Sequence, residues 1–139
     1  MNFKIINSIP FKRAVNTTLL LLSLVIVFHI LVLVQLFPYQ KVWGGRLHNA
    51  EEMQKFESVS ITVNLIIIGL IALRAGYLKI KWPYKIVQIA LALLVVLFTL
   101  NTIGNLFAVT LFEKLVFTPI TLVLAILCYR IYKEPKLPI

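Results

Sequence analysis

Four long apolar stretches divide the chain and limit what it can fold into. Each holds about 20 residues or more, which is the length an α-helix needs to cross the hydrocarbon core of a bilayer. Few residues remain for the connections between them. The sequence therefore predicts an all-α integral membrane protein, an up-down four-helix bundle with spans at about 14–37, 50–75, 85–108 and 111–132.

The composition agrees with one membrane-embedded unit and excludes several classes of protein. Of the 139 residues, 60% are hydrophobic and 14% are charged, whereas a water-soluble domain carries about a quarter charged residues. We therefore expect residues 1–139 to form a single transmembrane domain. The only cysteine, Cys128, excludes an internal disulfide and a cysteine-based zinc site. The net charge of +9 is distributed between apolar spans, so the expected partner is the lipid bilayer rather than nucleic acid.

The positions of the basic residues predict which way the bundle faces. If the N-terminus is cytoplasmic, ten of the fourteen Lys and Arg residues fall on the inner side. The other four, Lys41, Arg46, Lys55 and Lys114, fall on the outer side. The positive-inside rule favours this arrangement. The sequence therefore predicts a protein of the cytoplasmic (plasma) membrane with both termini in the cytoplasm.

Local signals predict where the helices begin and end. Pro38 disfavours helix at the residue before it and closes the first helix. Asn49 is a cap for the second helix, with Glu52 three residues later as in a capping box. Gly76 suits the left-handed residue that follows the end of that helix. Pro119 lies inside the fourth stretch and predicts a kink or local break, with Thr118 close enough to satisfy a freed backbone group.

Polar side chains recur at one depth of the predicted bundle, on its outer side. Such groups are costly inside a bilayer, so they carry most of the information about function. The spacing of Glu57 and Asn64 puts them on one face of the second helix, and Asn101 and Asn105 share a face of the third. Above them lies a loop with two adjacent glycines, which allow a tight turn. The candidate ligand-binding residues are His29, Trp43, Arg46, Glu57, Asn64, Asn101, Asn105 and Glu113.

Two interpretations of these residues remain open. In the first they fill a polar core, because Asn side chains often join membrane helices, and Glu113 serves only as a cap with Thr110. In the second they line a small cavity open to the outer face, since ligand sites are common between the helices of bundles. Arg46 is then placed to close the cavity by pairing with Glu57 or Glu113. The sequence predicts no metal site and no cofactor.

Several short motifs resemble a group of small four-span bacterial membrane proteins that are known only as hypothetical proteins. The resemblance covers most of the chain and implies the same four-span fold in a bacterial plasma membrane. It implies no activity, because none is known for that group. The residues that carry it are Trp43-Gly44-Gly45-Arg46, Glu51-Glu52-Met53, Phe56-Glu57, Asn64, Asn101, Gly104-Asn105 and Glu113.

Three functions are compatible with this pattern. The leading hypothesis is a protein that binds or transports a small polar or amphipathic ligand through the polar cluster, as a homo-oligomer if it conducts anything. The second is an accessory subunit that docks a partner through the loop from Trp43 to Arg46, residue types that are frequent in protein interfaces. The third is a membrane enzyme that acts on a lipid-like substrate with His29 and Glu57 as acid and base.

Overall fold

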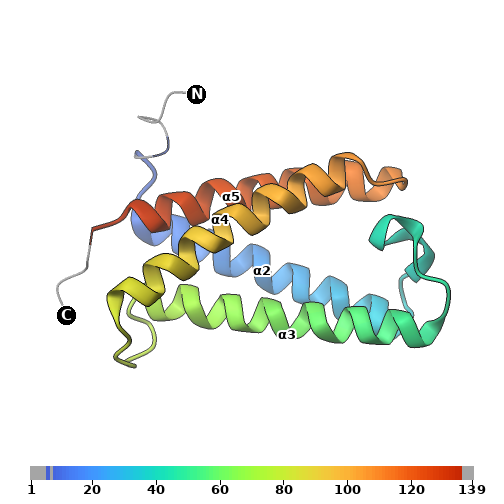
Figure 1. Cartoon of the computed structure of the whole chain (residues 1–139), viewed down its shortest axis with the longest axis horizontal. Coiled ribbons are helices and arrows are strands. Elements are labelled where there is room, and N and C mark those ends of the chain that lie inside the picture. Colours follow the sequence, from blue (N-terminus) through green and yellow to red (C-terminus); the bar gives the residue numbers. More distant parts are fainter. Residues whose placement is uncertain (1–5, 7, 136–139) are drawn as a thin grey trace.

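Four helices that are long and apolar enough to cross a membrane make up most of the chain (Figure 1). This computed structural model describes residue 6 and residues 8–135. No strand occurs among the described residues, so the all-α prediction is confirmed. The helices are α2 (Phe11–Leu33), α3 (Ala50–Arg74), α4 (Tyr84–Leu106) and a last span composed of a π-helical turn, η3 (Glu113–Phe117), and α5 (Thr118–Lys133). Two short 3-10 turns, η1 (Tyr39–Lys41) and η2 (Trp43–Gly45), lie between α2 and α3.

The first helix ends earlier than predicted, at Leu33 instead of residue 37. Gln35 takes a left-handed conformation with φ 59°. The backbone N–H of Leu36 then donates to the carbonyl oxygen of Leu31 at 2.9 Å, which is the pattern of a Schellman cap. The prediction failed because it used only the proline rule for Pro38. The chain has already left the helix before that proline is reached.

Both predicted ends of the second helix are confirmed. The Asn49 side chain accepts a hydrogen bond from the backbone N–H of Glu52 at 2.8 Å. The Glu52 carboxylate accepts in turn from the N–H of His48 at 3.0 Å, one residue before the position that a capping box uses. At the other end, Gly76 is left-handed, with φ 75°. The two-residue capping signal thus predicted the start of α3 more accurately than Pro38 predicted the end of α2.

The last span contains the break predicted from Pro119, in the form of the wide turn η3 just before it. Proline has no N–H, so an α-helical carbonyl four residues earlier loses its donor, and the turn is remodelled. The predicted role of Thr118 is wrong. Its hydroxyl is buried without a hydrogen-bond partner among the described residues. Thr121 donates instead, to the carbonyl oxygens of Phe117 (2.8 Å) and Thr118 (3.2 Å).

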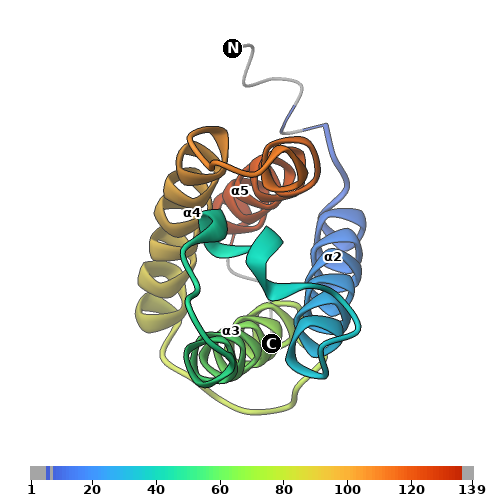
Figure 2. The ribbon, with the colours of Figure 1, turned by 90° about the vertical axis from the view of Figure 1, so that its right-hand side faces the viewer.

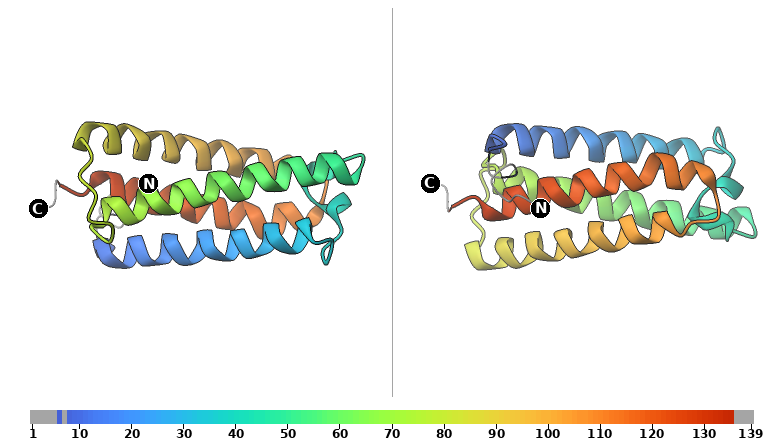
Figure 3. Two further views of the ribbon diagram at one scale, coloured as in Figure 1. Left: turned by 90° about the horizontal axis from the view of Figure 1, so that it is seen from below. Right: turned by 90° about the horizontal axis from the view of Figure 1, so that it is seen from above.

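The four helices form a ring in the order α4, α5, α2, α3, with one weak seam (Figures 2 and 3). Contacts are most extensive between α4 and α5, followed by α2 with α3 and α2 with α5, and they are sparsest between α3 and α4. Helices α3 and α4 are close at one end of the bundle and separate toward the other (Figure 1). We call these the Arg74 end (residues 8–11, 74–83 and 130–135) and the Trp43 end (residues 29–57 and 107–113).

Buried apolar side chains form two clusters along the bundle. The main core fills the Arg74 end and the middle, and includes Leu22, Ile71, Leu91, Leu124 and Ile131. A small cluster of Val32, Val42, Leu47 and Met53 lies beneath the loop at the Trp43 end. Large apolar side chains, such as Leu20, Ile66 and Leu93, are exposed on the outer faces of the helices. Such a surface is typical of a bundle in contact with acyl chains.

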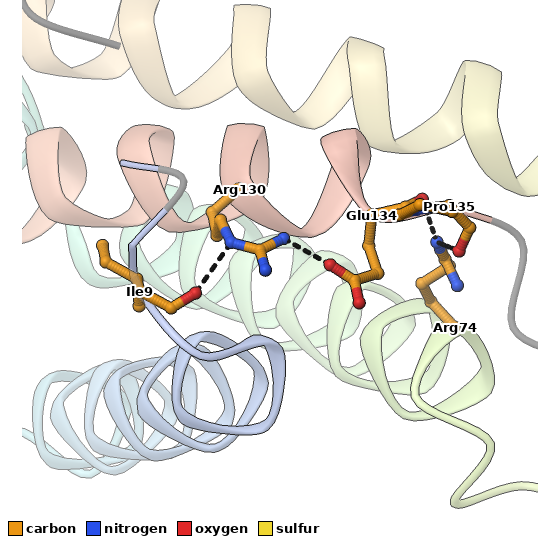
Figure 4. Close-up of polar contacts among 5 residues, drawn as sticks. All are labelled: Ile9, Arg74, Arg130, Glu134 and Pro135. Carbon is orange, nitrogen blue, oxygen red and sulfur yellow. Dashed lines mark hydrogen bonds and ion pairs between the residues drawn. The ribbon is translucent and has the colours of Figure 1, made fainter. Parts of the chain in front are cut away.

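Arginine side chains tie the Arg74 end together (Figure 4). Arg130 of α5 donates to the carbonyl oxygen of Ile9 at 2.8 Å and forms an ion pair with Glu134 at 2.6 Å. Arg74 of α3 donates to the carbonyl oxygens of Glu134 (2.6 Å) and Pro135 (3.1 Å). Three segments that are distant in sequence are therefore joined where the helices begin and end.

Candidate functional site

A cavity of about 420 Å³ lies at the Trp43 end, between the main core and the small apolar cluster. All four spans and the η2 loop contribute to its wall. On the side of the α3–α4 seam the wall includes Val59, Val63 and Leu100, whose side chains are also exposed on the outer surface. The cavity therefore reaches the outer surface of the bundle beside the sparse contact between α3 and α4.

Glu57 is the most deeply buried acid of the wall, with 1% of its surface exposed. Its Oε2 lies 2.6 Å from Nδ1 of His29 on α2. Its Oε1 accepts a hydrogen bond from the indole N–H of Trp43 at 2.8 Å. Both carboxylate oxygens are satisfied, as a buried acid requires. One side chain of α3 thus fixes a residue of α2 and a residue of the loop.

The loop reaches Glu57 through an unusual left-handed turn. Trp43, Gly44 and Gly45 have φ values of 55°, 67° and 69°. The glycines adopt this region without strain, whereas Trp43 does not. The hydrogen bond from Trp43 to Glu57 and the contact of its ring with Phe56, at 4.9 Å between centroids, help to hold it there. In Figure 2 the η1 and η2 turns lie across the centre of the helix ring.

Glu113 holds the same turn from the opposite side. Its Oε2 accepts from the backbone N–H of Gly44 at 2.8 Å and from the hydroxyl of Thr110 at 2.7 Å. The Thr110 hydroxyl is 3.4 Å from the N–H of Glu113, so the predicted cap is present although weak. Only 7% of Glu113 is exposed. Two carboxylates from two helices therefore anchor adjacent residues of one loop.

Three asparagines complete the polar side of the wall. Asn64 donates from Nδ2 to the carbonyl oxygen of Ser60 at 2.9 Å, which leaves its Oδ1 as an acceptor. Asn105 makes only a long contact of 3.5 Å with the hydroxyl of Thr121. Asn101 makes no hydrogen bond with any described residue, and its side chain is exposed. The amides therefore present unused donors and acceptors to the space that they enclose.

The structure brings together seven of the eight candidate residues from the sequence, and Arg46 is the exception. His29, Trp43, Glu57, Asn64, Asn101, Asn105 and Glu113 all line this cavity. Arg46 is exposed and lines a separate hollow with His48 and Glu52. Among the described residues it forms an ion pair with neither Glu57 nor Glu113, so the predicted closure by Arg46 is wrong.

The physical reason for this error is that neutral donors satisfy both acids. The indole of Trp43 and the backbone N–H of Gly44 occupy the positions that the sequence analysis gave to a guanidinium. A backbone donor leaves no trace in a sequence. The structure also adds Gly104 and Thr121 to the wall, together with Phe28 and Phe117. Nothing distinguishes these four residues from packing residues when the sequence is read alone.

The arrangement contains an acid–base pair but no metal cluster. His29 and Glu57 are in hydrogen-bond contact beside the cavity, so together they can hold or move a proton. Among the described residues, no three His, Cys, Asp or Glu side chains are grouped so that they could hold a metal ion. No protein-family model, no curated protein and no solved structure matches this chain. The function is therefore inferred from the cavity and the residues that form it.

Proposed function

We propose that this chain is an integral membrane protein that binds a small amphipathic molecule in the cavity. The polar part of the ligand contacts the amides and acids of the wall, and its apolar part passes between α3 and α4 toward the lipid. The observation that carries the proposal is the shape of the wall. It is polar inside, where the half-buried Asn64 and Asn105 lie, and mostly apolar where it opens at Val59 and Val63.

The asparagine amides that lack a hydrogen-bond partner within the described residues support the proposal that a molecule binds in the cavity. An amide at membrane depth without a partner is costly, and a leucine at position 101 would remove that cost. Asn101 makes no hydrogen bond with the described residues and yet faces this cavity. A ligand or water that enters the cavity would satisfy it. The volume of about 420 Å³ also falls in the usual range of ~300–1,000 Å³ for small-molecule sites.

We also propose that both termini are cytoplasmic, so that the Trp43 end faces outward. The asymmetry of ten basic residues against four supports this orientation. Reporter fusions at each terminus test it. We expect a reporter that works only in the cytoplasm to be active at both ends. Activity of an external reporter at either end would overturn the orientation while leaving the binding proposal intact.

Substitution of Gly104 tests the binding proposal, because this residue lines the cavity and a side chain there meets empty space. Gly104→Phe puts a large ring at the cavity wall, and nothing lies within 4 Å of the Cβ that it adds. Gly69→Phe is the matched control, since Gly69 is also helical, also has nothing within 4 Å of an added Cβ, and is not part of the wall. Both changes remove a helical glycine and improve helix propensity to a similar degree.

The measurement is native mass spectrometry of each protein, extracted gently from the membrane in which it is produced. We expect a small-molecule adduct on the wild type and on Gly69→Phe, with a clear loss of the adduct on Gly104→Phe. Equal adduct levels on the two variants would contradict binding in this cavity. So would the absence of an adduct from the wild type, if added amphiphiles also fail to bind.

A second candidate function rests on the contact between His29 and Glu57. A hydrogen-bonded imidazole and carboxylate beside a ligand cavity is what general acid–base chemistry on a bound lipid-like molecule requires. His29→Gln and Glu57→Gln keep hydrogen-bonding ability but remove proton transfer. If the protein is an enzyme, both variants should retain the adduct and lose turnover of it. Retained turnover in either variant would exclude this function.

A further inference from the structure

Acids outnumber bases among the ionisable residues of the cavity wall. Of the described residues that line the cavity, Glu57, Glu113 and His29 are ionisable, and none is Lys or Arg. The chain as a whole has fourteen Lys and Arg residues against five acids. The wall therefore differs from the rest of the molecule. It has two carboxylates and at most one cation, the imidazolium of His29.

The partners of the two acids leave this charge mostly uncompensated. Trp43, Gly44 and Thr110 are neutral donors that stabilise a carboxylate without cancelling its charge. Only Glu57 has an ionisable partner, His29. Glu113 receives its donors on Oε2, which leaves Oε1 as an acceptor on a side chain of the wall. Inside an apolar bundle, one negative charge favours a cationic ligand more strongly than it would in water.

Other features of the wall also suit a cation and disfavour an anion. Trp43, Phe28, Phe98 and Phe117 contribute aromatic rings, and the face of such a ring attracts an ammonium group. Asn64 offers an amide oxygen. A phosphate or sulfate head would need arginine, lysine or a set of backbone N–H donors. The one arginine of the loop, Arg46, lines a different hollow.

From these observations we infer that the ligand is an organic cation, an ammonium head with an apolar tail. The head lies between Glu113 and the amides, and the tail leaves through the α3–α4 seam. This inference rests on the proposed function and specifies the chemical class of its ligand. It makes Glu113 the residue that selects the charge of the head, while Glu57 and His29 position the loop.

Tryptophan fluorescence provides a readout inside the cavity. The chain has two tryptophans, Trp43 in the wall and Trp82 at the Arg74 end. In a Trp82→Phe background the signal comes from Trp43 alone. The full chain in phosphatidylcholine nanodiscs is titrated with three probes that have the same tail: octyltrimethylammonium, 1-octanol and octyl sulfate. We expect the cation to bind at least tenfold more tightly than either of the others.

Charge variants then test the assignment to Glu113. Glu113→Gln keeps an oxygen for Gly44 and should weaken binding of the cation about tenfold while leaving octanol unchanged. Glu51→Gln is the matched control, because Glu51 is exposed near the same end, outside the wall, and pairs only with Lys55. If Glu113→Gln does not fold, Asn101→Lys provides the second test. It puts a cation into the wall at an unbonded position and should reverse the preference toward octyl sulfate.

The possible outcomes separate this inference from the proposed function. Selective binding of the cation that depends on Glu113 supports both. If octanol or octyl sulfate binds as tightly as the cation, the inference about charge is overturned and the binding function stands. Cation binding that is equal in Glu113→Gln and Glu51→Gln, or an unchanged preference in Asn101→Lys, also overturns it. If none of the three probes changes the Trp43 signal, the proposed function falls as well.

Discussion

The two ends of the bundle both bury charged side chains, and they satisfy them in opposite ways. At the Arg74 end, two arginines donate to carbonyl oxygens of segments outside the helices, Ile9, Glu134 and Pro135 (Figure 4). At the Trp43 end, two glutamates accept from N–H and O–H groups of the loop and of a helix cap. At one end the cations meet backbone acceptors and one carboxylate, and at the other the anions meet neutral donors and one imidazole.

The difference explains why one end is filled and the other is hollow. The arginines donate to segments near the chain ends, and the main apolar core packs beneath them. The glutamates accept hydrogen bonds from the loop. This loop lies across the centre of the helix ring (Figure 2). These hydrogen bonds hold the loop above the cavity, and the contact between Glu57 and His29 also joins α3 to α2. The arginine contacts thus stabilise the packed Arg74 end. The glutamate contacts stabilise the loop above the cavity at the Trp43 end.

Removal of the Glu57 carboxylate should have the largest effect on stability. Glu57→Ala removes a buried acceptor and leaves His29 Nδ1 and Trp43 Nε1 without it. We expect the free energy of unfolding to fall by about 3 kcal/mol. Thermal unfolding in nanodiscs measures the loss, and hydrogen exchange locates it. Exchange should increase in residues 34–49 and stay unchanged at the Arg74 end. Uniform loosening of both ends would show that the two ends are not independent.

Removal of Arg130 should have the next largest effect and should act at the opposite end. Arg130→Met keeps the apolar stem but loses the bond to Ile9 and the ion pair with Glu134, which is 21% exposed. We expect a loss of about 2 kcal/mol, less than for Glu57 because water reaches this end. Octyltrimethylammonium should bind to the variant as it does to the wild type. Altered binding would mean that the filled end controls the site.

Substitution in the left-handed turn should have a smaller effect. An alanine at Gly44 would clash with nothing, because the nearest atoms to its Cβ are those of the flexible Arg46 side chain at 3.5 Å. The cost comes from its φ of 67° and is about 1 kcal/mol. Gly69→Ala in the middle of α3 is the control and should be neutral or slightly stabilising. A stability equal to that of the wild type for Gly44→Ala would show that the turn is not held in this conformation.

The smallest effect is expected for the exposed ion pair between Glu51 and Lys55, at 2.7 Å with both side chains mostly in solvent. Glu51→Ala should cost about 0.3–0.5 kcal/mol, and less in high salt. Thermal unfolding at low and high ionic strength measures it. A loss as large as that of Glu57→Ala would contradict the view that burial, and not charge alone, determines how much an acid of the Trp43 end contributes.

Much of the fold was predictable because it depends on composition and local signals. The lengths of the apolar stretches are consistent with the four spans, and the Asn49 cap and Gly76 were located correctly. The end of α2 was not, because Gln35 is not a residue that usually signals a left-handed cap. Such a conformation is decided by tertiary contacts that a sequence window does not contain.

The membership of the candidate site was more predictable than its contacts. Helical spacing and depth were enough to group His29, Glu57, Asn64 and Asn101, because polar residues in a membrane bundle have few other places to lie. The pairing of charges was not predictable. Arg46 was the obvious partner by charge, but Trp43 and the backbone of Gly44 are nearer to the acids. The conformation of the loop decides which donor binds each acid. Residue spacing in the sequence does not predict that conformation.

The extra residue of the π-helical turn η3 has a consequence for the orientation of Glu113. In an α-helix each residue advances by about 100° around the axis. A π-helical turn has hydrogen bonds to the fifth residue instead of the fourth, so one extra residue fits into the turn and the helix on either side keeps its phase. Deletion of Leu115 should therefore let the turn revert to the α form with Glu113 still directed toward the cavity. The same deletion inside the regular part of α5 has no such compensation and should rotate the residues before it by about 100°.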